Sequence, residues 1–229
     1  MADNRITKKR IKDHWHYSWW KYAIFAVVAV IGIDLLFSST AYRSPEDRRI
    51  QLYMCNGHAD AEALEADLWP ALLEACPGQE ELMVMNIDLT RDDYYTRMQF
   101  MTYVAAQEGD VCLLPVKEVR SLAADGADDA FLELTPYVES GVIPTEGIDL
   151  EAGMLEDANG VRGLYAIPAG TLYGLYEYGC NPAGGMLCAM VYGGNDDTAA
   201  ALIGQMIERF AVDPPQSDSP VQGQTRILQ

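Results

Sequence analysis

Basic side chains and histidine are scarce in this sequence, and catalytic motifs are absent. The 229 residues include 16 Lys and Arg against 34 Asp and Glu, and only three His. This excess of negative charge argues against binding to nucleic acid or to an anionic membrane surface. There is no GxSxG motif, Walker loop, GxGxxG after a strand, or HExxH. The sequence therefore predicts no enzyme activity, no catalytic residue, no cofactor and no metal.

Cysteine is also rare and follows no metal-binding pattern. The five cysteines are Cys55, Cys76, Cys112, Cys180 and Cys188, and their spacings match no zinc site. Cys55 and Cys112 lie in apolar, strand-like runs, which favours buried free thiols. A disulfide between Cys180 and Cys188 is the alternative that the sequence leaves open.

One long apolar run lies near the N-terminus. No charged residue occurs between Lys21 and Asp34, and the apolar block reaches Phe37. A helix of about 20 residues spans about 30 Å, the thickness of the hydrocarbon core of a bilayer. We predict a transmembrane helix over residues 22–38. Aromatic side chains suited to the inner headgroup level flank its start: Trp15, Trp19, Trp20 and Tyr22.

The charges on either side of the run predict its orientation. Residues 1–21 carry six basic and two acidic side chains, whereas residues 38–229 carry ten basic and 31 acidic ones. Basic segments stay in the cytoplasm. The pattern therefore predicts a single-pass protein of the cell membrane with a cytoplasmic N-terminus and an extracytoplasmic main domain.

Two alternatives to an anchor remain open. Ser39 and Ala41 fit the small-residue rule for a signal peptide cleaved after Ala41. The second alternative is a buried helix of a soluble domain. Asp34 is costly within hydrocarbon, but it lies near the outer end of the run, where its carboxylate can reach the interface.

Beyond the run, the chain divides into three predicted parts. Residues 39–49 form a polar stalk, and residues 50–212 are long enough for one domain with its own core. Residues 213–229 have no core-forming pattern and are predicted to be disordered.

The first half of the domain alternates strand and helix patterns. Strands are predicted over 49–57, 81–89 and 110–115, and helices over 59–76, 91–107 and 116–124. This order predicts an α/β fold with a mostly parallel sheet flanked by helices. Pro70 is expected to kink the first helix or to start a second one. In helix 91–107, Thr90 is expected to begin a capping box, and Tyr94, Met98, Met101 and Ala105 are expected to face inward.

The second half is predicted to be mainly strands. They cover 161–170, 171–182 and 185–195, and a helix with a clean apolar stripe follows over 197–211. On a strand at 171–182, Tyr176 and Tyr178 would share one face and Tyr173 would lie on the other. Exposed tyrosines there could contact a sugar or a peptide, and cross-strand packing is the other interpretation.

Two clusters of oxygen-bearing side chains are dense enough to consider calcium. One contains Asp88, Asp92 and Asp93, and the other spans residues 195–197. Neither has EF-hand spacing, and capping of the helices that follow is the simpler explanation.

Several segments resemble extracellular solute-binding proteins with the type 2 periplasmic-binding fold. They are Asp88-Leu89-Thr90 at a strand end, the Tyr- and Met-rich helix that follows, Gly109 before Asp110–Leu114, the stretch DDAFLELTPYVESGVIP, and GLYAIPAG. The domain has about half the usual length of sugar-binding members, so a reduced second lobe is expected. A membrane helix stands where the family carries a lipid-bearing cysteine.

The resemblance implies a membrane-anchored binding module that captures a small solute, a sugar or a peptide, or assists a membrane permease. It places a ligand site where strand ends meet the cleft, at Asn56, His58, Pro115, Tyr173 and Tyr176. The alternative function is a ligand-free domain for protein–protein contact at the cell surface.

Overall fold

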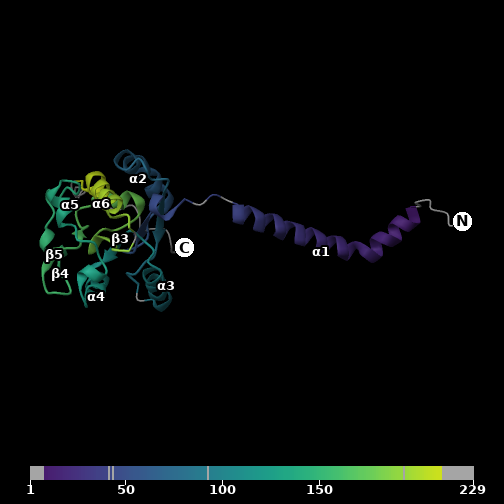
Figure 1. The fold of residues 1–229 in the computed structure, drawn as a ribbon, viewed down its shortest axis with the longest axis horizontal. Coiled ribbons are helices and arrows are strands. Elements are labelled where there is room, and N and C mark those ends of the chain that lie inside the picture. Colours follow the sequence, from purple (N-terminus) through teal and green to yellow (C-terminus); the bar gives the residue numbers. More distant parts are fainter. Residues whose placement is uncertain (1–7, 41, 43, 92, 193, 213–229) are drawn as a thin grey trace, which may run out of the picture. The chain divides into compact units, whose positions relative to one another are not determined.

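The computed structural model describes residues 8–40, 42, 44–91, 93–192 and 194–212, in two compact units, Met1–Arg43 and Ser44–Gln229. The predicted tail, 213–229, lies outside the described residues. In the first unit, α1 (Lys8–Thr40) is a continuous 33-residue helix (Figure 1). Its segment Trp15–Thr40 is long and apolar enough to cross a bilayer, and a signal sequence would show the same features. The predicted N-terminal apolar helix is confirmed.

The second unit is built on a mixed five-stranded sheet with the order β2-β1-β3-β7-β6. β2 (Glu81–Asn86), β1 (Arg49–Met54) and β3 (Val111–Pro115) are parallel, as predicted. β7 (Gly185–Ala189) runs antiparallel to β3 and to β6 (Ile167–Pro168). A separate antiparallel pair contains β4 (Met154–Glu156) and β5 (Arg162–Leu164).

Helices cover both faces of the sheet (Figure 1). α2 (Ala61–Ala75) and α6 (Asp196–Phe210) contribute to one buried cluster, and α3 (Tyr94–Ala105) and α4 (Val116–Leu122) contribute to the other. Shorter helical segments are η1 (Glu46–Arg48), η2 (Ala127–Asp129), α5 (Thr135–Glu139), η3 (Leu150–Gly153) and η4 (Tyr173–Tyr178). The predicted α/β fold with flanking helices is therefore confirmed.

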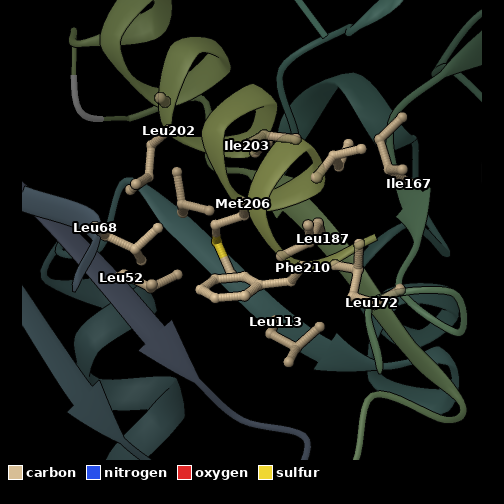
Figure 2. Close-up of a cluster of buried hydrophobic side chains, with 14 of the residues drawn as sticks. Leu52, Leu68, Leu113, Ile167, Leu172, Leu187, Leu202, Ile203, Met206 and Phe210 are labelled. Atoms are coloured by element: carbon tan, nitrogen blue, oxygen red, sulfur yellow. The ribbon is translucent and has the colours of Figure 1, made fainter. Parts of the chain in front are cut away.

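The larger cluster lies between α6 and the sheet. Met206 and Phe210 point from α6 onto Leu52 and Leu113 of the strands (Figure 2), and all four side chains are buried. Asn195 stands at the N-cap position, but its side chain makes no capping hydrogen bond. It donates instead to the backbone oxygens of Glu46 and Arg49, each at 3.1 Å. The predicted helix and the N-cap position of Asn195 are thus confirmed, but the Asn195 side chain does not cap the helix.

Two other local predictions are corrected. α2 runs through Pro70 as one helix, so no second helix starts there. α3 begins at Tyr94 rather than 91, because Asp93 and not Thr90 caps it: the Asp93 carboxylate accepts from the backbone N–H of Thr96 at 3.0 Å.

Candidate functional site

The predicted ligand site lies at the carboxyl ends of the parallel strands, where Asn56 follows β1. Asn56 is buried, and its side-chain amide donates to the backbone oxygens of Asn181 at 3.0 Å and Ala183 at 3.2 Å. These bonds hold the turn at 181–185 against the strand end. The amide that was predicted to meet a ligand is therefore engaged by the chain itself.

The other predicted site residues surround the same turn or lie apart from it. Tyr176 donates its hydroxyl to Asn181 Oδ1 at 3.0 Å, and Pro115 pairs in register with Gly185. His58 is exposed and Tyr173 is half-buried. None of the five predicted site residues lines the cavity at the amino ends of β1 and β3, the cavity beside residues 120–126, or the cavity at the start of α6.

The segment around Tyr173 is a 3₁₀ helix, η4, and not the predicted strand. Gly174 allows this conformation, because a Cβ there would lie 3.0 Å from Phe210 Cα. The turn brings Tyr178 edge-on to the Phe210 ring, at 5.5 Å between centroids, and its hydroxyl donates to Asp67 at 2.8 Å. Tyr178 thus packs on the core, and Tyr176 does not share a strand face with it.

The first oxygen cluster makes local bonds, whereas Asp197 of the second accepts from the distant Tyr137 hydroxyl at 3.1 Å. Asp88 accepts from the backbone N–H of Thr90 at 3.0 Å, and Asp93 caps α3. Asp92 lies outside the described residues. Among the residues that the structure describes, no group of three His, Cys, Asp or Glu is placed to hold a metal ion.

All five cysteines are free thiols, and all but Cys76 are buried. Cys180 and Cys188 belong to different hydrophobic clusters, so a disulfide between them is not formed. Burial raises the pKa of the Cys55, Cys112 and Cys188 thiols. The thiolate is the reactive form of cysteine, and these three side chains are therefore structural.

The orientation of α3 differs from the prediction. Phe100 is its buried residue, with Tyr103 and Val104 half-buried against the same cluster. Arg97 lies on this inner side and pairs with Glu118 of α4 at 2.7 Å. Glu118 is only 6% exposed, and a buried carboxylate needs a partner. The ion pair and Phe100 therefore select the face that packs on the sheet.

The apolar stripe that was predicted to face inward consequently faces outward. Tyr94 is 67% exposed, and Met98 and Met101 are each 48% exposed. With the exposed Ala105, these residues form what we call the α3 stripe. Tyr95 lies beside it and is 78% exposed. Sequence patterning missed this surface because it assigned the stripe to the core.

Neither a protein-family model nor a curated protein matches this sequence.

Proposed function

We propose that the chain is a membrane-anchored, non-catalytic module for protein–protein contact, and that the α3 stripe is where it meets a second copy of itself. The observation that carries this proposal is the exposure of Tyr94, Met98 and Met101 on one side of a helix. Contiguous exposed apolar side chains of this size are typical of interaction surfaces.

The charge distribution favours a second copy as the occupant. The chain has a net charge of -18, so two copies repel each other over most of their surfaces. α3 is the one α-helix of the described residues without Asp or Glu. Its single cation, Arg97, is already paired with Glu118. An interface formed by α3 of both copies would therefore place no carboxylates of α3 close to one another.

The spacing of the stripe also suits self-association. Tyr94, Met98, Met101 and Ala105 are separated by four, three and four residues, the a/d spacing of paired helices. A two-fold axis near the middle of α3 would place the same residues of both copies in contact, as in most homodimers. Anchoring of both copies in one membrane would raise their effective concentration.

A solute-binding role at the carboxyl ends of the strands has less support. Its central polar side chain, Asn56, already donates its amide hydrogens to the 181–185 turn. The mouth of a solute site requires free polar groups that converge on a ligand.

The association is tested on the full chain in lipid nanodiscs or detergent, with its mass measured by sedimentation equilibrium. We expect a dimer for the native chain and a monomer for Met98→Glu, because the substitution places two carboxylates in the contact. Gln99→Glu is the matched control: it adds the same charge to the same helix at an exposed position beside the stripe, and it should remain dimeric. A monomeric native chain, or equal masses for both variants, would overturn the proposal.

The membrane orientation is proposed separately, with residues 1–21 in the cytoplasm and the domain outside, on the strength of the charge asymmetry. A tag fused after Gln229 should be accessible to protease on intact cells. A tag found in the cytosol, or a mature chain free of membranes and starting at Tyr42, would contradict this orientation or the anchor.

A further inference from the structure

A polar cavity of about 210 Å³ lies at the amino ends of β1 and β3, on the opposite edge of the sheet from Asn56. Three segments enclose it: the start of β1 with η1 before it, the loop from α3 into β3, and the loop from β7 into α6. The polar and charged residues of its lining include Glu46, Arg49, Gln51, Glu108, Asp110 and Asn195.

Gln51 brings an unpaired donor to this cavity. Its side chain belongs to a residue that is only 8% exposed, and its Oε1 accepts from the Tyr53 hydroxyl at 2.9 Å. Its Nε2 donates to no residue that the structure describes. This donor is therefore available to a polar occupant of the cavity, either water or a ligand.

Arg49 adds a second set of donors beside Gln51. The two residues are separated by one position on β1, so their side chains leave the same face of the strand. Within the described part of the chain, the Arg49 guanidinium makes no hydrogen bond and no ion pair. A guanidinium next to an amide NH₂ suits a carboxylate, which accepts two parallel hydrogen bonds.

Carboxylates surround these donors. Asp110 is 7% exposed; its Oδ2 accepts from the backbone N–H of Gln51 at 2.7 Å, and its Oδ1 accepts from Asn195 Nδ2 at 3.2 Å. Burial raises the pKa of Asp110, against the opposing hydrogen bonds from Gln51 and Asn195 and the charge of Arg49. Glu46 and Glu108 line the cavity from exposed positions. A simple anion would meet three carboxyl groups here, and a simple cation would meet Arg49.

The volume limits the size of the occupant. Sites for drug-sized ligands are larger, at roughly 300–1,000 Å³. A solute with few non-hydrogen atoms and both signs of charge fits the lining and the volume.

We propose that this cavity binds a free, zwitterionic α-amino acid. Its carboxylate accepts hydrogen bonds from the Arg49 guanidinium and Gln51 Nε2, and its ammonium group faces Glu46 and Glu108. This inference is independent of association through α3, since it depends on different residues. The domain would then bind a small solute at the amino ends of the strands. The resemblance to solute-binding proteins implies a site at the opposite, carboxyl ends.

Isothermal titration calorimetry of the full chain in detergent tests the proposal with glycine, L-alanine and L-serine. Acetate and methylammonium serve as probes that carry one charge each. At least one amino acid should bind at least about tenfold more tightly than either probe, because each probe lacks half of the charge-assisted bonds. Acetate that binds as tightly as alanine, or no heat with any amino acid, would overturn the proposal; in the latter case the cavity holds water only.

Variants locate the binding. Arg49→Gln should weaken amino-acid binding at least about tenfold, and Arg49→Lys, which keeps the charge without the planar fork, should weaken it less. The matched control is Arg91→Gln, an exposed arginine whose ion pair with Asp88 follows the carboxyl end of β2; it should bind as the native chain does. Circular dichroism confirms that each variant is folded. Unchanged binding in folded Arg49→Gln would place the ligand elsewhere and overturn the proposal.

Discussion

α6 and α3 show two outcomes of the same kind of sequence pattern. Each carries an apolar stripe at helical spacing. In α6, the stripe is buried on the sheet, and Ile203, Met206 and Phe210 are at most 2% exposed (Figure 2). In α3, the stripe with Met98 and Met101 faces away from the sheet.

The difference lies in what occupies the remaining faces of each helix. α6 has polar and charged residues opposite its stripe, and Arg209 in its last turn pairs with Asp67. Only one face of α6 can be buried. α3 has a second apolar edge with Phe100 and Val104, so hydrophobicity does not decide which edge packs inward. The Arg97–Glu118 pair stabilises burial of the Phe100 edge. A helix that is apolar on two sides can pack one face against its own domain and leave the other for a partner.

The largest effect should come from the centre of the α6 contact. Phe210→Ala is expected to lower the free energy of unfolding by about 3–5 kcal/mol, because it leaves a cavity under Tyr178 and among the strands. Urea denaturation followed by circular dichroism measures it. A loss near that of a surface substitution would mean that α6 does not form the core.

Arg97→Ala should have the next largest effect, about 1–3 kcal/mol of stability, because it leaves the buried Glu118 carboxylate without its partner. The matched control is Arg91→Ala, whose side chain is 84% exposed in its pair with Asp88, and which should change stability by less than about 0.5 kcal/mol. Equal effects of the two substitutions would show that the ion pair does not orient α3.

The Asp67 contact at the end of α6 should appear as a pH dependence. A hydrogen bond from Arg209, assisted by one from Tyr178, lowers the pKa of Asp67 against the weaker opposing effect of burial. A carboxyl whose folded pKa lies below its unfolded value of about 3.9 contributes stability above that pH, and the contribution is lost as the pH falls through the folded pKa. Asp67→Asn should therefore reduce the difference in the free energy of unfolding between pH 6 and pH 3, as measured by urea denaturation. A difference equal to that of the native chain would show that Asp67 is not stabilised by these hydrogen bonds.

The smallest effect is expected on the α3 stripe. Met98→Ala should change the stability of the monomer by less than about 0.5 kcal/mol, because the side chain faces solvent. Phe100→Ala, two residues further along the helix, should cost about 3–5 kcal/mol. Denaturation at low protein concentration compares the two. A Met98 effect close to that of Phe100 would mean that the stripe is buried after all.

Patterns confined to one segment predicted most of the fold. The apolar runs at β1 and β3 and the one-sided stripe of α6 are local signals, and the structure confirms them. η4 was missed because its conformation depends on Gly174 lying against Phe210, a contact between segments distant in the sequence. The polar cavity and the exposed α3 stripe likewise depend on contacts between segments distant in the sequence. Gln51, Asp110 and Asn195 converge only through the register of β1 with β3, and the outward turn of Met98 depends on Glu118 in another helix.

Disulfide trapping at the α3 stripe tests whether α3 pairs with α3 of a second copy. Met98→Cys and Gln99→Cys are compared in membranes, each in the full chain with the partly exposed Cys76 replaced by Ser, under mild oxidation. We expect a covalent dimer on a non-reducing gel for Met98→Cys and little or none for Gln99→Cys. No dimer from either position, or equal dimer from both, would contradict an outward stripe that pairs with a second copy.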